Sequence, residues 1–173
     1  MKFYDEDFLK DILLLHLAAQ YAPGRIVKRL IDTFGMQTCQ NERNESNQTP
    51  LAIALINDNV PAVEAFLSSK INIQDLEIDN HQPCFSYYLQ KSSSLNLCSD
   101  FLRLGAQPKS IDKLGNTSLH LICKNIERNS FIDSLKLLID HGVNVNKKNY
   151  QGLFNNRLKD GFYLKKKSDF SII

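Results

Sequence analysis

The side chains best suited to metal binding or nucleophilic catalysis in this 173-residue chain are four histidines and four cysteines. No two histidines are spaced to share one helix face, and no two cysteines form a C-x-x-C pair, so the ligand spacings of a zinc site are missing. We therefore expect no metal site and no cofactor, and cysteines that are reduced and mostly buried. The residues are His16, His81, His120, His141, Cys39, Cys84, Cys98 and Cys123.

Catalysis by other routes has equally little support in the sequence. Gly24 and Gly115 belong to no glycine-rich phosphate-binding loop, and the carboxylates are spread out, with no pair marked for acid–base work. Cys123 follows His120 by three residues, which is close enough to suggest a thiolate–imidazole pair. We nevertheless interpret Cys123 as a core residue, and we expect the chain not to be an enzyme and to have no small-molecule substrate.

The chain repeats a pattern that is clearest at residues 112–146. This unit begins with Asp112-Lys113-Leu114-Gly115-Asn116-Thr117-Ser118-Leu119-His120 and ends with Gly142-Val143-Asn144-Val145-Asn146. Taking the Thr117 position as a mark, similar positions fall at 13, 49, 82 and 154, which gives steps of 36, 33, 35 and 37 residues. A period near 33 residues indicates stacked structural repeats.

The motif resembles the ankyrin repeat, D-x-x-G-x-T-P-L-H-x-A followed by a leucine-rich helix. The resemblance implies an all-α solenoid of about four to five helix-turn-helix units joined by short β-hairpin loops. It also implies that His16 and His120 bond to backbone in the neighbouring hairpin, and that Cys123 takes the place of a small packing residue. The match is weakest at residues 76–91.

Apolar periodicity supports the same architecture. Leu51, Ala54 and Leu55 share one face of a short helix, which can bury that face only against a neighbouring unit. Glycines after the second helices suit a left-handed residue at the helix end. We predict one domain over 1–173, with an N-terminal cap at 1–12, repeats at about 13–43, 44–76, 77–111 and 112–148, and a partial repeat, C-terminal cap and basic tail at 149–173.

The family resemblance implies that a protein partner binds at the hairpin tips and the ends of the first helices, on a concave face. Ile78, Leu114 and Tyr150 are the strongest candidates, because an exposed apolar tip residue has no role in folding. The implied contact residues are Glu45, Ser46, Gln48, Asn57, Ile78, Asp79, His81, Gln90, Lys113, Leu114, Asn116, Lys124, Asn125, Tyr150 and Gln151.

Charge is divided unevenly along the chain. Residues 1–79 contain seven basic and twelve acidic residues, net −5, whereas residues 80–173 contain fourteen and seven, net +7. The last 27 residues hold a basic tail around Lys165-Lys166-Lys167, for which we favour a solvated cap over binding to an anionic membrane or nucleic acid. The acidic start is unlike a signal peptide.

We expect a monomer in the cytoplasm that binds a protein of unknown identity. The degenerate repeats resemble those of ankyrin effectors that intracellular bacteria or large viruses send into host cells, which makes the host cytosol a further location to consider. Two alternatives stay open: targeting repeats of a longer enzyme, and an adaptor that uses the basic tail.

Overall fold

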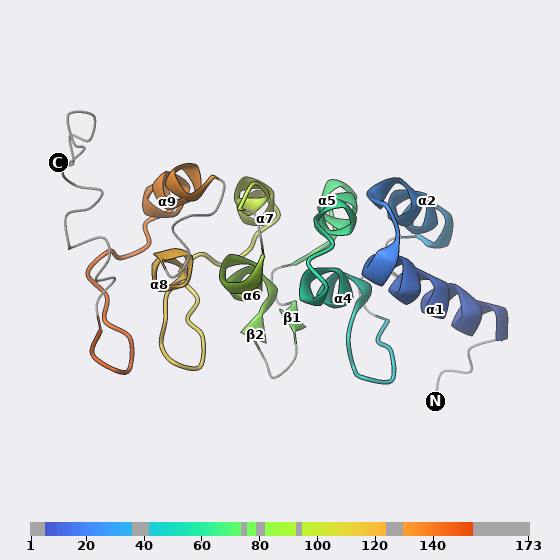
Figure 1. Cartoon of the computed structure of the whole chain (residues 1–173), viewed down its shortest axis with the longest axis horizontal. Coiled ribbons are helices and arrows are strands. Elements are labelled where there is room, and N and C mark those ends of the chain that lie inside the picture. Colours follow the sequence, from blue (N-terminus) through green and yellow to red (C-terminus); the bar gives the residue numbers. More distant parts are fainter. Residues whose placement is uncertain are drawn as a thin grey trace.

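The computed structural model describes residues 6–35, 42–73, 76–78, 82–92, 95–123 and 130–153. Four helix pairs follow one another along an elongated body, with the first helices in one layer and the second helices in the other (Figure 1). The first helices are α1 (Glu6–Tyr21), α4 (Pro50–Ile56), α6 (Cys84–Lys91) and α8 (Ser118–Ile122). The second helices are α2 (Gly24–Phe34), α5 (Val60–Ser68), α7 (Cys98–Arg103) and α9 (Phe131–Asp140). The predicted all-α solenoid is confirmed.

Local signals in the sequence start several of these helices. Thr49 caps α4, its hydroxyl accepting a hydrogen bond from the Ala52 N–H at 3.3 Å, and Pro50 follows at the first helical position. Asn59 caps α5 in the same way, accepting from the Ala62 N–H at 3.3 Å. A side-chain acceptor satisfies one of the amide groups that a helix N-terminus leaves without a partner.

Glycine ends the second helix of three units, as the sequence predicts. Gly35, Gly105 and Gly142 have φ of 82°, 93° and 72°. These angles lie in the left-handed region, where a side chain would be strained. The chain can therefore reverse directly from the second helix of each of these units into the connection that follows.

The third unit lacks the consensus motif and fills its core with aromatic side chains instead. Tyr88 and Phe101 are stacked with ring centroids 4.7 Å apart, and Phe85 lies 5.6 Å from Phe101. The Tyr88 hydroxyl accepts a hydrogen bond from the Leu97 N–H at 2.9 Å. Offset aromatic pairs stabilise a core beyond the area they bury, so large rings compensate for the missing leucine and histidine.

The expectation that Ile78 is an exposed tip residue is wrong. Ile78 ends strand β1 (Glu77–Ile78), which pairs antiparallel with β2 (Gln82–Pro83), and its side chain is only 5% exposed. Successive side chains of a strand point to opposite faces, so a residue close to the tip can still point into the core. Ile78 therefore contributes to folding and leaves no apolar surface for a partner.

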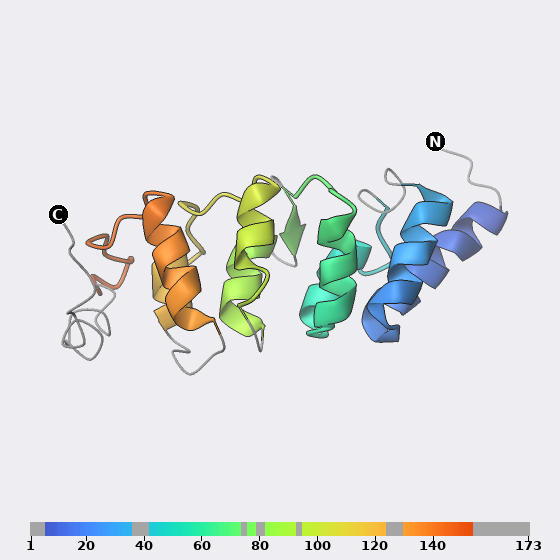
Figure 2. The same cartoon turned by 90° about the horizontal axis from the view of Figure 1, so that it is seen from above.

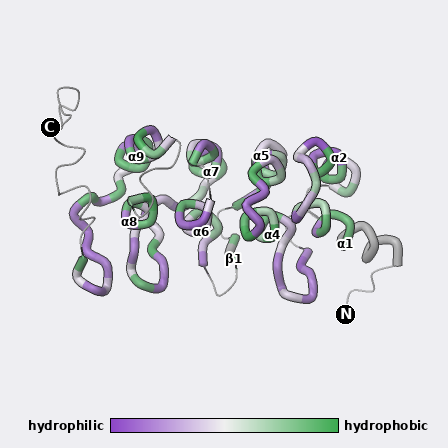
Figure 3. The backbone as a smooth tube through the Cα atoms, in the orientation of Figure 1, coloured by the Kyte–Doolittle hydropathy of each residue, from purple (hydrophilic) through white to green (hydrophobic). Residues whose placement is uncertain are grey.

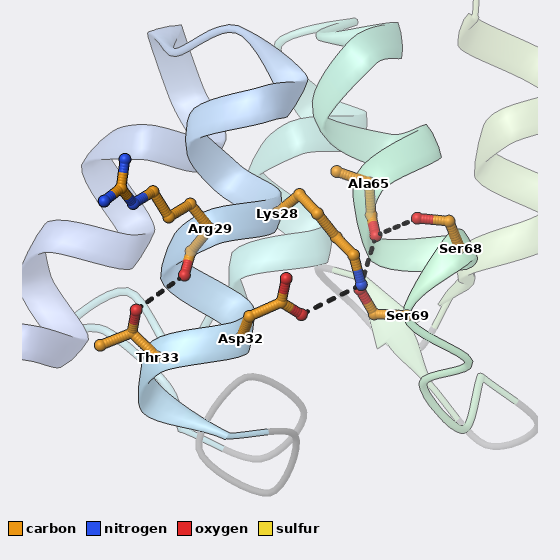
Figure 4. A network of polar contacts seen from close by, with 7 residues as sticks. All are labelled: Lys28, Arg29, Asp32, Thr33, Ala65, Ser68 and Ser69. Carbon is orange, nitrogen blue, oxygen red and sulfur yellow. Dashed lines mark hydrogen bonds and ion pairs between the residues drawn. The ribbon is translucent and has the colours of Figure 1, made fainter.

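Polar contacts between the second helices add to the stacking (Figure 4). Lys28 Nζ on α2 donates to the Ser69 hydroxyl at 2.9 Å and forms an ion pair with Asp32 at 3.1 Å. Ser69 in turn donates to the Ala65 carbonyl at 2.8 Å. Because the lysine is partly exposed, this contact fixes the register of two units more than it adds to stability.

Apolar burial between the units accounts for most of the stability. Figure 3 shows that hydrophilic residues are concentrated in the projecting hairpins.

Leu119 of α8 is fully buried. We predict that Leu119→Ala lowers the free energy of unfolding by about 2–5 kcal/mol, through lost burial and the cavity left behind. Leu114→Ala is a matched control, because Leu114 is half exposed five residues earlier. Urea denaturation followed by circular dichroism measures both; equal midpoints would contradict the assigned packing.

Candidate functional site

Three described hairpins project from the same edge of the molecule, at residues 42–49, 111–117 and 148–153 (Figure 1). Each contains an asparagine or aspartate whose side-chain oxygen accepts two backbone N–H bonds of 2.8–3.0 Å. Such side chains stabilise turns by replacing backbone acceptors. The acceptors are Asn44 (from Ser46 and Gln48), Asp112 (from Leu114 and Asn116) and Asn149 (from Gln151 and Leu153).

Two histidines join the helical stack to these hairpins. His16 Nε2 lies 3.1 Å from the Gln48 carbonyl, and His120 Nε2 lies 3.1 Å from the Leu153 carbonyl. In His120, Nδ1 lies 3.2 Å from the Thr117 amide nitrogen, so both ring nitrogens are bonded. A carbonyl only accepts, which assigns the hydrogen of His120 to Nε2 and leaves Nδ1 as the acceptor. The expected structural role of both histidines is confirmed.

The hairpins at 111–117 and 148–153 are bonded to each other. The Tyr150 N–H donates to the Leu114 carbonyl at 3.0 Å, and Asn149 Nδ2 donates to Asn116 Oδ1 at 2.9 Å. The Tyr150 ring also covers Gly115, where a Cβ atom would lie 2.7 Å from the ring. Together these contacts make the two tips one rigid unit.

An apolar surface is left open on this unit. Leu114 is 52% exposed and Tyr150 is 73% exposed, on hairpins that the backbone bond holds side by side. We call these two residues the tip pair. Leu153, also half exposed, lies on the same hairpin as Tyr150 and was left out of the predicted contact residues, although Gln48 and Asn116 at the same position of their units were included. The expected exposure of Leu114 and Tyr150 is confirmed.

Asn116 does not lie on the open surface. It is buried, and its side chain bonds both Asn149 and Asp112 Oδ2, the latter at 2.9 Å. A side-chain amide can be buried at little cost in stability when its hydrogen bonds are satisfied. Including Asn116 among the exposed contact residues was therefore wrong, since it joins the hairpins to each other.

The other predicted contact residues are spread over the hairpin edge. Those that are exposed are Glu45, Ser46, Asn57, Lys113 and Gln151, whereas Gln48 and Gln90 are half-buried. Asn57 also ends α4, donating from Nδ2 to the Ile53 carbonyl at 2.8 Å, and Gln90 Oε1 accepts from Gln82 at 3.1 Å. Asp79, His81, Lys124 and Asn125 lie outside the described residues.

The described cysteines are buried free thiols. Burial raises the pKa of Cys84 to about 12 and that of Cys98 to about 11. Cys123 is buried as well, and the neighbouring His120 has both ring nitrogens bonded to other groups. A thiol with a raised pKa is a poor nucleophile near neutral pH, so these residues pack in the core.

Within the part of the chain that the structure describes, no cluster of three or more histidine, cysteine or carboxylate side chains is arranged to hold a metal ion. The same residues include no helix with the length and apolar character that a membrane span requires.

Comparison with known proteins agrees with the repeat pattern. Residues 114–150 match the family model for the ankyrin repeat. The chain is 25% identical to mouse synphilin-1 over 143 residues, 80% of this chain and 14% of that protein. It is 29% identical to the mouse B-cell lymphoma 3 protein homolog over 115 residues, 64% of this chain and 25% of that protein. The matched region is therefore a minor part of each relative.

We predict that His120→Ala lowers the free energy of unfolding by about 1–3 kcal/mol, because it leaves a buried amide and a carbonyl without their partner. Amide exchange at Tyr150 should become faster, since the hairpin loses its link to α8. His141→Ala is the matched control: His141 is exposed, and its Nδ1 lies 2.8 Å from the Leu137 carbonyl of its own unit. Unchanged exchange in the His120 variant would contradict the linking role.

Thiol labelling tests the buried cysteines. A raised pKa keeps Cys84 and Cys98 protonated at pH 8, so we predict slow modification by a disulfide reagent in the folded protein and fast modification in urea. The native rate should rise only as the pH approaches 11 to 12. Peptide mass spectrometry assigns each site. Native labelling of Cys84 at the urea rate would show an accessible thiolate.

Proposed function

Because this chain carries an ankyrin repeat and is built from stacked units of the same architecture, we propose that it binds a partner protein through its hairpin edge, with the tip pair, Leu114 and Tyr150, at the centre of the contact. Ankyrin repeats are interaction modules, and a stack of them offers an extended surface to a partner. The proposal assigns binding, and no reaction, to this chain.

The single observation that supports this proposal most strongly is the exposed apolar tip pair on a rigid support. Leu114 and Tyr150 expose more than half of their surface, yet their backbones are fixed by hydrogen bonds to each other and, through Asn149, to Asn116. Little ordering entropy is lost when a pre-organised side chain enters a partner's pocket. Aromatic residues in such positions commonly dominate the free energy of binding.

Charge beside the tip pair favours an acidic partner. The tip pair is flanked by exposed Lys113 and Lys147, whereas the hairpin at 42–49 exposes charges of both signs, Arg43 and Glu45. Complementary charge steers the encounter with a partner. We therefore propose a partner whose apolar anchor is surrounded by acidic residues.

The place of action is also part of the proposal. Three described cysteines are free thiols, a form that the reducing cytosol maintains. We propose a cytosolic binding protein. Delivery into a host cell as an effector is a narrower form of this proposal that rests on the resemblance of the degenerate repeats alone.

We predict that the double change Leu114→Ala, Tyr150→Ala weakens partner binding by more than about 30-fold, or about 2 kcal/mol. The denaturation midpoint should hardly change, because both side chains are exposed. The partner is first isolated by pull-down and mass spectrometry, and calorimetry then gives the affinities.

Lys136→Glu is the matched control on α9, a second helix on the opposite layer of the molecule, where Lys136 is exposed. It should leave binding unchanged. If the α9 change abolished binding and the tip change did not, the hairpin edge would not be the binding surface.

A further inference from the structure

The first helix leaves an apolar face uncovered at the N-terminal end of the stack. Its inner face buries Leu15, Ala18 and Ala19. The opposite face exposes Leu13 by 59%, Leu14 by 48%, Leu17 by 49% and Tyr21 by 77%. We call these four residues the end face. Terminal units of repeat proteins normally need a polar outer face for solubility, so an apolar one is a candidate interface.

The later units show what this face does elsewhere in the chain. The residues equivalent to Leu17, at the same distance from the repeat mark, are Ile53, Ser86 and Leu121, and all three are buried. The residue equivalent to Leu14 in the fourth unit, Ser118, donates to the Pro108 carbonyl of the preceding connection. In every later unit, then, the position of Leu17 is closed, whereas Asn57, which is equivalent to Tyr21, is exposed. The end face of α1 continues an interface that the rest of the stack uses.

A further repeat of the same kind is a poor match for this face. The His16 and His120 side chains each join one unit to the hairpin of the next, as in His16 to the Gln48 carbonyl. The residue equivalent to Gln48 in the first unit is Ile12, which lies inside α1. A carbonyl inside a helix is already bonded to the amide four residues later. In other units the residues just before the repeat mark form a hairpin, whereas in the first unit they belong to α1. The end face is therefore suited to packing against another helix.

We propose that the end face binds a second copy of this chain, with the two α1 helices packed antiparallel across a two-fold axis. α1 has 16 residues, against seven, eight and five for α4, α6 and α8. It is thus about 24 Å long, and its first half extends beyond the stack (Figures 1 and 2). A two-fold interface uses the same residues on both copies, so one exposed face covers the other.

Charge is compatible with this pairing. The end unit, residues 6–35, contains four basic and four acidic residues, so two copies do not repel each other through net charge. The helix dipoles also favour an antiparallel pair of α1 helices.

The size of the end face sets the strength expected. Its four side chains expose roughly 500 Å² of apolar surface, which is more than isolated surface residues provide and less than half of a large obligate interface. We therefore expect a dimer that dissociates at about micromolar concentration. This replaces the monomer expected from the sequence.

Sedimentation equilibrium of the full chain, from about 1 µM to about 1 mM, tests the proposal. The expected result is a reversible monomer–dimer equilibrium that Leu17→Glu weakens by more than about 30-fold. Leu114→Glu, an equal change at an equally exposed leucine on a hairpin, should leave the dimer intact. Circular dichroism and urea denaturation show that each variant is folded; if Leu17→Glu does not fold, Tyr21→Glu replaces it.

Cross-linking locates the axis. Leu17→Cys should form a disulfide between copies more readily in oxidising buffer than Gln151→Cys does, because Leu17 lies at the centre of the end face, close to the two-fold axis. A chain that is monomeric over the whole concentration range overturns the proposal, and so does a dimer that Leu17→Glu and Tyr21→Glu leave intact. Capture of a different protein by the end face of a monomeric chain would also overturn it.

Discussion

Contact between neighbouring units is the interaction on which every other feature of this molecule depends. The described helices after α1 have five to eleven residues, and helices of that length are marginal in water. They persist because each first helix buries one side against the unit before it and the other against the unit after it. Stability is therefore a sum of contributions from within each unit and from the contacts between neighbouring units.

The same contact gives the hairpins their rigidity. A hairpin that projects from a helical layer has few apolar contacts and would be mobile if it were attached by its ends alone. Here the His16 and His120 side chains reach from one unit to a carbonyl of the next hairpin, and side-chain oxygens of Asn44, Asp112 and Asn149 hold the turns. These hydrogen bonds hold the hairpin tips against the packed helices, so tip residues that contribute little to folding still have fixed positions.

The sequence predicted those features that follow from the period and from residue chemistry. Three features could be predicted because each depends on one residue type at a fixed position in the repeat: the unit pattern, the glycines at the helix ends and the role of His120. The third unit could be predicted only as a degenerate repeat. Its core uses Phe85, Tyr88 and Phe101, and aromatic packing has no short sequence signature that reveals which rings will meet.

Side-chain direction near the tips was less predictable. Ile78 and Leu114 occupy comparable places in their hairpins, yet one is buried and the other exposed. The difference arises because Ile78 lies in strand β1, where side chains alternate between two faces, whereas Leu114 lies in the turn of its hairpin. The hairpins at 111–117 and 148–153 turn at Gly115 and Gly152, whereas the hairpins at 42–49 and 77–83 contain no glycine. Asn116 shows the same limit: a polar residue near a tip was taken as exposed, but a partner in the adjacent hairpin buries it.

The sequence contains a signal for the exposed face of α1, but the signal is easily overlooked when the run is interpreted as part of a repeat. Leu13, Leu14, Leu15 and Leu17 place apolar residues around most of a helix, and a helix that is apolar on several sides must be covered on several sides. In an internal unit both neighbouring units cover such a helix, so a run of apolar residues is expected there. In the first described unit Leu13, Leu14 and Leu17 are exposed, and they form a surface. The stacking that stabilises the interior of a repeat array therefore produces an adhesive face at any end that polar residues do not cap.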